Sequence, residues 1–299
     1  MSGGFHIRTE HLKLIATSHV RNSLRGAAGV IFLILSMLVG LILAAIAVFP
    51  VEAAMKFSEK IGGQQETAAQ VFDKAIHKWG PSVLDTVVGA SPGQAHYLLD
   101  NKPALISLFL VLLVIFLPFF AALGGFNQTA GDIGSKGLRY LLLRTERSNI
   151  FLGRLIGTYV FTLTVITVIV AVVGLYVMLK VRFYPATDVA GWMFRGWIAC
   201  AIFAMPWVAL YAWISAAVPM PFLSLLVGAG GLIFWIAIVA IMRGKAEWIG
   251  YAAYATPWGY KWWLFDPSAG KVILGVVVML AFTGLFTFLG LRTFHRRDM

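Results

Sequence analysis

Long apolar runs alternate with shorter polar segments along this chain. Six of these runs reach about 20 residues or more, the length that a helix needs to cross the hydrocarbon core of a bilayer. They cover residues 27–49, 104–126, 155–179, 191–218, 222–242 and 272–291. A backbone surrounded by lipid must satisfy its own hydrogen bonds, so apolar runs of this length predict helices. The pattern therefore predicts an all-α membrane protein with six transmembrane helices.

The polar segments predict the elements that connect these spans. Residues 1–26 mix basic and apolar side chains and are expected to form an N-terminal interfacial helix at the membrane surface. Residues 50–103 are bounded by prolines and predict a small outer cap between spans 1 and 2. The run 27–49 is too long for the apolar core of a signal peptide and is expected to remain as the first span. The other polar segments are predicted to be a cytoplasmic loop (127–154), an outer aromatic segment (243–270) and a cytoplasmic tail (292–299).

Composition agrees with a membrane protein. Hydrophobic residues make up 60% of the chain and charged residues only 12%, and the mean hydropathy is +0.83, all far from the values of a soluble domain. The net charge of +11 raises nucleic acid as a partner. Cytoplasmic loops of membrane proteins collect Lys and Arg, however, so no nucleic-acid partner is expected. The single cysteine, Cys200, excludes an intrachain disulfide and any multi-cysteine metal site.

The distribution of Lys and Arg predicts the orientation. On one side of the membrane the basic residues lie close to span ends, whereas those of the 50–103 segment are offset by carboxylates. The first group is Arg8, Lys13, Arg21, Arg25, Lys136, Arg139, Arg144, Arg147, Arg154, Arg292, Arg296 and Arg297. The carboxylates are Glu52, Glu59, Glu66, Asp73, Asp85 and Asp100. Basic residues near span ends favour the cytoplasm, so we expect an inner-membrane protein with both termini cytoplasmic.

The sequence lacks the common catalytic and nucleotide-binding motifs. It contains no GxxxxGK[ST] phosphate-binding loop, no HExxH and no GxSxG. The histidines are scattered over loops and chain ends, where solvated polar roles are more common than metal binding. We therefore expect no catalytic residues, no metal site and no cofactor bound by this chain itself.

Charge inside the predicted spans separates two kinds of transporter. None of the spans contains Asp or Glu, whereas an ion-coupled transporter usually needs an intramembrane carboxylate. A secondary transporter is therefore disfavoured, and the energy for transport is expected from elsewhere. The one charge within a span is Arg195, near the outer end. It either extends to the interface or meets an anionic group of a substrate or lipid.

A basic polar interruption follows the second span, with the sequence NQTAGDIGSKGLRYLLLRTERSNIFLGRLIG over 127–157. Its Lys-Gly-Leu start, its leucine-rich block ending at Arg144 and its Gly-Arg-Leu entry into the third span resemble the pattern of ABC-2 type exporter permeases. The ending Phe294-His295-Arg296-Arg297-Asp298 resembles the tail of that family. The topology resembles it over the whole chain, 1–299, as one transmembrane domain. Two features depart from the pattern: no proline follows Arg144, and the first outer loop is longer than in minimal members.

The resemblance implies a function for this interruption. A cytoplasmic coupling helix over residues 138–147, between spans 2 and 3, would sit in a cleft of a separate ATPase subunit that binds ATP and Mg. The chain would pair with a second copy or a sibling permease and export a hydrophobic or amphipathic substrate. The implied coupling residues are Leu138, Arg139, Tyr140, Leu141, Arg144, Glu146 and Arg147. The alternative is a solvated basic loop facing anionic lipid headgroups.

Aromatic residues crowd the outer segment at 243–270. They are Trp248, Tyr251, Tyr254, Trp258, Tyr260, Trp262, Trp263 and Phe265. An aromatic belt at the membrane interface is the general explanation. In the resembled family this region forms short re-entrant helices near the exit. The candidates for the substrate path or exit are therefore Arg195, Trp258, Trp262 and Trp263.

Two functions remain open at this point. The first is the permease subunit of an ABC exporter. The alternative is a membrane anchor or mechanotransmission subunit of an ATPase-driven envelope machine that moves no solute. The alternative would place force, and an envelope partner, on the outer cap at 50–103. The sequence does not indicate the substrate.

Overall fold

A computed structural model describes residues 8–26, 29–42, 45, 76, 80–81, 84, 91–135, 138–180, 184–243 and 251–297. These residues form helices and connecting turns, with no strand among them. The all-helical class predicted from the hydrophobic pattern is thus confirmed for this part of the chain. Most of the predicted cap at 50–103 lies outside the described residues, as do Lys136 and Trp248.

Five helical segments of the described chain are long and apolar enough to cross a membrane. They contain α5 (Ala104–Gly125), α8 (Arg147–Lys180), α9 (Ala186–Ala217), α10–η1–α11 (Pro221–Leu225, Leu226–Gly230 and Gly231–Arg243) and α13 (Ala269–Arg296). A sixth span results if α1 (Thr9–Arg25) and the helix Gly29–Ile42, which meet at 66°, are counted together. Helices of this number and length are those of a multi-pass membrane protein.

The helices extend beyond the predicted spans. Helix α8 begins at Arg147 rather than at 155, α9 begins at Ala186 rather than at 191, and α13 continues to Arg296. Hydropathy marks only the part of a helix that would lie in lipid, whereas backbone hydrogen bonds continue the helix into its polar ends. Most of the predicted tail at 292–299 is therefore helical.

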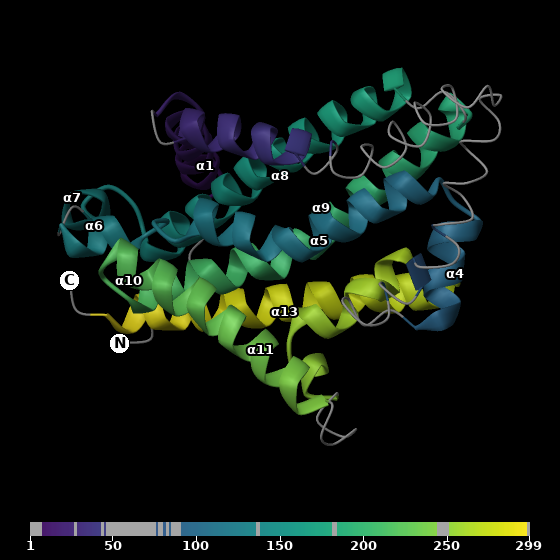
Figure 1. Ribbon diagram of the computed structural model, residues 1–299. Helices are drawn as coiled ribbons and strands as arrows, with labels where there is room; N and C mark the ends of the chain where they lie inside the picture. Colours follow the sequence, from purple (N-terminus) through teal and green to yellow (C-terminus); the bar gives the residue numbers. More distant parts are fainter. Residues whose placement is uncertain are drawn as a thin grey trace, which may run out of the picture.

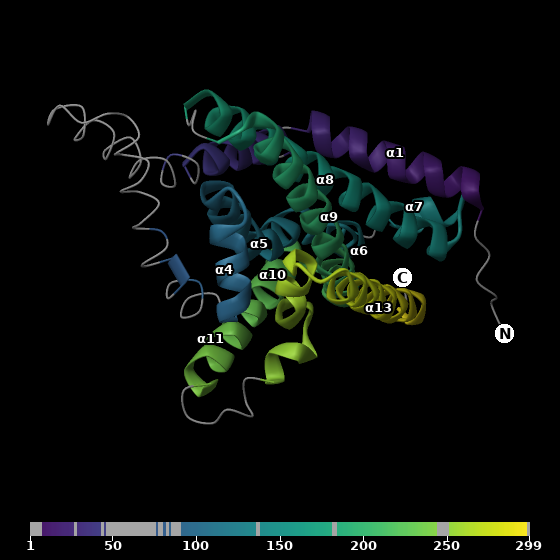
Figure 2. The same cartoon turned by 90° about the vertical axis from the view of Figure 1, so that its right-hand side faces the viewer.

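Four of the long helices form the body of the molecule. Figure 1 shows α5, α8, α9 and α13 side by side, with α11 diverging from the others. Figure 2 shows α1 along α8 and α13 on the other side of α9. The short helices α6 (Ala130–Gly134) and α7 (Leu138–Leu142) lie at one end, and α4 (Pro92–Asp100) lies at the other. The most apolar window of α5 is 72% buried, whereas that of α13 is 11% buried, so α5 forms the core and α13 the periphery.

The span formed by α10, η1 and α11 is interrupted by the π-helical turn η1. Gly228 in this turn lies against Tyr211 of α9, since a Cβ atom on Gly228 would stand 2.5 Å from Tyr211 Cε1. Only a residue without a side chain permits this approach, which brings the interrupted span onto α9.

Two glycines one turn apart let α1 pack closely on α8. A Cβ atom on Gly153 would stand 2.8 Å from Ile15 Cγ2, and one on Gly157 would stand 2.9 Å from His19 Cβ. Small residues spaced by four present one face of a helix for close contact. His19 Nε2 is also hydrogen-bonded to Thr158 Oγ1 at 3.0 Å. The contact between α1 and α8 therefore depends on the glycine face.

Valine at Gly157 is expected to push α1 away from α8. The added side chain would overlap His19, and overpacking of this kind costs about 1–3 kcal/mol. Trypsin cleavage after Arg21 and Arg25 of the purified chain measures the displacement, with faster cleavage expected for the variant. Gly284→Val is the matched control, because a Cβ atom at Gly284 meets nothing within 4 Å. Equal cleavage rates for the two variants would contradict the packing described above.

Candidate functional site

Helix α7 is mounted on a small apolar cluster at one end of the bundle. The side chain of Leu138 is 1% exposed and that of Leu142 is half-buried against the same cluster. The other buried members come from the ends of α8, α9 and α13 and are Ile150, Phe151, Ala212, Ala216 and Phe294. The rings of Phe151 and Phe294 lie 5.9 Å apart between centroids. The base of α7 is thus joined to three of the long helices.

The opposite face of α7 and the residue after it expose large apolar side chains. Tyr140 is 78% exposed, Leu143 is 84% exposed and Leu141 is 38% exposed. Arg139 and Arg144 are exposed beside them. We call Tyr140, Leu141 and Leu143 the apolar tip. Apolar anchors surrounded by charged residues are typical of a surface that inserts into a protein groove.

Arg147 faces its own chain. Its Nη1 atom donates to the backbone carbonyls of His295 at 2.7 Å and Arg297 at 2.8 Å, and more distantly to that of Phe294 at 3.4 Å. The last carbonyls of a helix lack intrahelical partners and carry negative partial charge, so a guanidinium group stabilises them. Arg147 therefore joins the start of α8 to the end of α13.

A second arginine completes this connection. Arg297 Nη1 donates to the carbonyl of Ala216, at the end of α9, at 2.6 Å. The indole Nε1 of Trp213 donates to Thr293 Oγ1 at 3.1 Å. The ends of α8, α9 and α13 are thus connected by side chains directly beneath α7.

The predicted coupling residues divide into two groups. Arg139, Tyr140, Leu141 and Arg144 are exposed, whereas Leu138 is buried and Glu146 and Arg147 are half-buried. Leu143, the most exposed leucine of the block, is missing from the predicted set. No periodicity separates three consecutive leucines in so short a helix. The only sequence signal for the exposure of Leu143 was the arginine that follows it, because a charged residue marks the end of the leucine-rich block.

The turn between α5 and α6 is held by buried hydrogen bonds. Ser215 Oγ on α9 accepts from the backbone N–H groups of Thr129 at 2.9 Å and Ala130 at 3.0 Å. Arg154 on α8 forms an ion pair with Asp132 and donates to the carbonyl of Gln128 at 2.5 Å. The segment before α7 is therefore fixed to both α8 and α9.

His19 stands at the contact between α1 and α8. Burial of its imidazole, and then the nearby charge of Arg154, lower the pKa of His19 to about 4, although Asp132 acts in the opposite direction. The neutral ring is hydrogen-bonded to Thr158. The contact is therefore built for an uncharged histidine.

Acid is expected to weaken the fold through His19. The unfolded chain takes up this proton near pH 6.5 and the folded chain near pH 4. The unfolded state therefore binds more protons between these values, and stability falls as the pH is lowered through this window. Thermal unfolding in detergent at pH 7.5 and 4.5 tests this, with a smaller loss expected for His19→Gln. A control variant at an exposed histidine, His96→Gln, should keep the full loss. If His19→Gln also keeps it, His19 is not the group responsible.

The residues predicted for a substrate path lie at the opposite end of the bundle from α7. Arg195 Nη1 donates to Tyr97 Oη at 3.2 Å, and its Nη2 donates to the carbonyl of Asp266 at 2.8 Å. Its guanidinium carbon is 5.4 Å from the ring centroid of Trp192. Arg195 thus connects α9 to α4 and to the end of η3 (Pro257–Phe265).

The three predicted tryptophans have different surroundings within η3. Trp262 is buried, and Trp258 and Trp262 both lie near the ammonium of Lys261. Trp263 is half-buried and packs edge-on against Tyr260, with 4.9 Å between ring centroids. The short helix η2 (Tyr251–Ala255) continues this aromatic packing through Tyr254. Arg195 and the three tryptophans therefore do not form one shared open surface.

No family model matches the chain, and no curated protein matches it. Among the residues that the structure describes, no group of three or more His, Cys, Asp or Glu side chains is placed to hold a metal ion. The fold itself defines a multi-pass helical membrane protein with an exposed apolar tip at one end.

Proposed function

We propose that this chain is the membrane-spanning permease subunit of an ABC transporter, and that its apolar tip docks into a cleft of a separate ATPase subunit. The observation that carries the proposal is the exposure of Tyr140, Leu141 and Leu143 on a base that joins α8, α9 and α13. A mobile surface loop would have no need for such a base. A docking element that transmits movement requires one.

The charges around the tip describe the expected partner surface. Arg139 and Arg144 are exposed on either side of the tip and would pair with carboxylates at the rim of an apolar cleft. The chain has no phosphate-binding loop, so ATP and Mg would be bound by the partner. Closure of two ATPase subunits would move two such tips together and shift the membrane dimer between states.

Uncovered apolar faces support a membrane location and a second permease chain. The span formed by α10, η1 and α11 is 17% buried and α13 is 11% buried in their most apolar windows. Surface of this kind lies against lipid or against another protein chain. We propose a dimer, with itself or with a sibling permease, in the inner membrane. Both termini would be cytoplasmic, on the side of α7.

The proposed role is export of a hydrophobic or amphipathic substrate. The uncovered faces of α11 and α13 offer apolar surface along the membrane, and the aromatic rings of η3, joined by those of η2, pack against α13. An amphipathic molecule suits both environments. The proposal therefore defines the substrate only as a hydrophobic or amphipathic molecule.

One contact favours the alternative function, force transmission without solute movement. Asp266 accepts hydrogen bonds from Gln94 of α4 at 3.1 Å, from the backbone of Ser268 at 2.9 Å and from Lys271 of α13 at 3.2 Å. Burial alone would raise the pKa of Asp266, but these bonds outweigh it and lower the pKa. This rigid connection would carry force from an envelope partner on the cap to α13.

Co-expression of this chain with its neighbouring genes, followed by a search for a co-purifying ATPase, tests the proposed function. A tag on this chain is expected to retain the ATPase during purification. The Leu141→Asp, Arg144→Glu double variant should lose it, and Lys13→Glu on the exposed face of α1 should not. A folded, membrane-inserted chain that retains no ATPase would refute the proposal. ATP-driven uptake of fluorescent lipid into inverted vesicles then separates the two functions, because an exporter moves the lipid and a force-transmitting subunit does not.

A further inference from the structure

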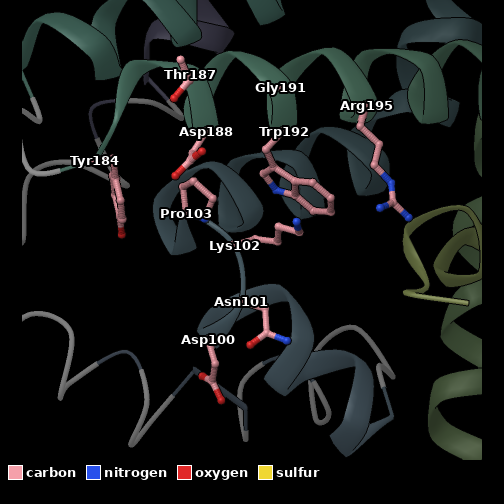
Figure 3. Close-up of a pocket in the computed structure, with 10 residues that line it drawn as sticks. All are labelled: Asp100, Asn101, Lys102, Pro103, Tyr184, Thr187, Asp188, Gly191, Trp192 and Arg195. Carbon is pink, nitrogen blue, oxygen red and sulfur yellow. The ribbon is translucent and has the colours of Figure 1, made fainter.

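A cavity of about 530 Å³ lies at the end of the bundle opposite α7. It opens between the end of α4, the start of α5 and the start of α9, as Figure 3 shows. Its volume falls in the range of about 300–1,000 Å³ that small-molecule sites occupy. The lining residues that matter here are Asp100, Lys102, Tyr184, Thr187, Asp188 and Trp192.

The cavity lies at the boundary between polar and apolar surroundings. Pro103 and Pro185 are the N-caps of α5 and α9, and both helices are candidate spans. The buried apolar side chains of α5 begin directly after Pro103. Tyr184 and Trp192 line the cavity, and aromatic residues of these types are enriched at the level of lipid headgroups. A ligand here would therefore be placed at headgroup depth.

One cation of the cavity is held against an aromatic ring. Lys102 Nζ lies 5.3 Å from the ring centroid of Trp192 and 5.7 Å from that of Tyr97. The indole Nε1 of Trp192 donates to Ser107 Oγ at 3.0 Å, which fixes the ring. Across the described part of the chain, no carboxylate comes within ion-pair distance of Lys102. Its ammonium is thus positioned and has no anionic partner.

The cavity also contains a carboxylate that has no cationic partner among the described residues. Asp188 is exposed in the first turn of α9, and no described side chain forms an ion pair or hydrogen bond with its carboxylate. Asp100 is paired with His96 at 3.0 Å, and Arg195, which also lines the cavity, already donates to the hydroxyl of Tyr97 and the carbonyl of Asp266. The two charges left for a ligand are therefore the cation of Lys102 and the anion of Asp188.

We propose that this cavity binds a zwitterionic group that carries a phosphate and an ammonium, as in a phosphatidylethanolamine headgroup or free phosphoethanolamine. The phosphate would pair with Lys102, and the ammonium would pair with Asp188. A purely anionic headgroup would be repelled by the carboxylates of Asp188 and Asp100. A purely cationic headgroup would be repelled by the ammonium of Lys102. Binding here does not depend on the ATPase partner.

Calorimetric titration of the full chain in phospholipid-free detergent tests this inference. Dihexanoyl-phosphatidylethanolamine should bind, and dihexanoyl-phosphatidylglycerol should bind at least about tenfold more weakly, because one charge-assisted pair is replaced by repulsion. Lys102→Gln and Asp188→Asn should each weaken the first lipid about tenfold. The controls Lys13→Gln and Glu10→Gln, on exposed positions of α1, should bind like the unaltered chain.

A change of preference distinguishes a binding role from a loss of folding. Asp188→Lys should bind the phosphatidylglycerol more tightly than the phosphatidylethanolamine, which a damaged protein would not do. Free phosphoethanolamine that binds as tightly as the lipid identifies the small zwitterion as the ligand, and binding that requires the acyl chains identifies the lipid. Equal affinity of the unaltered chain for both lipids, or no binding of either, would overturn the inference.

Discussion

Aspartate in place of Leu143 is expected to lower the affinity for the ATPase partner at least about 100-fold, which is the cost of losing a central apolar anchor. Leu143 is the most exposed side chain of the apolar tip, and a carboxylate there would have to be buried in an apolar cleft. It contacts none of the buried cluster below α7, so the fold should be unaffected. Titration of the ATPase onto the purified chain in nanodiscs measures the effect.

The matched control is Leu14→Asp. Leu14 is 72% exposed on α1, so the same change is made on another apolar surface. Its affinity for the ATPase should equal that of the unaltered chain. Equal losses for both variants would mean that the tip is not a specific docking element.

Glutamine in place of Arg147 is expected to separate ATPase binding from transport. The change removes the cation that pairs with the carbonyls of His295 and Arg297 at the end of α13. Hydrogen bonds to a charged group contribute about 1.5–3 kcal/mol each, so the stability in detergent should fall by about 2–3 kcal/mol after partial solvation of the carbonyls. The tip itself is unchanged, so the ATPase should still bind.

Two measurements on one reconstituted complex check this outcome. ATP hydrolysis should persist with Arg147→Gln, whereas the transport driven by each hydrolysed ATP should fall severalfold. Arg139→Gln, which changes an exposed arginine of the neighbouring helix α7, should keep normal stability. Unchanged stability and transport for Arg147→Gln would show that its contacts with α13 carry no movement.

The hydrophobic pattern predicted the helices well because each long apolar run requires its own backbone hydrogen bonds in lipid. It could not locate their ends. The polar continuation of α8 back to Arg147 and of α13 forward to Arg296 has no hydropathy signal. The break at η1 was also not predicted, since it depends on the approach of Gly228 to Tyr211 of another helix.

The short surface helix was predictable in position and not in length: the predicted coupling helix over 138–147 ends at Leu142 in the structure, and Arg147 is already the first residue of α8. The short leucine-rich block with flanking arginines indicated where a surface helix would lie. The partners of Arg147 could not be predicted, because His295 is 148 positions away in the sequence. For Arg195 the sequence left an interface role and an anion-binding role open. The structure gives it partners on α4 and at the end of η3.

Thiol labelling tests the central claim, that α7 docks on an ATPase, most directly. Cys200 is the single cysteine of the chain and is fully buried, so a cysteine introduced at Leu143 would be the one accessible thiol. We predict that a maleimide labels Leu143→Cys rapidly in the chain alone and at least about tenfold more slowly with the ATPase bound, as a buried anchor requires. Glu10→Cys on α1 should be labelled at the same rate in both states. Unchanged labelling of Leu143→Cys in a complex that contains the ATPase would contradict the account.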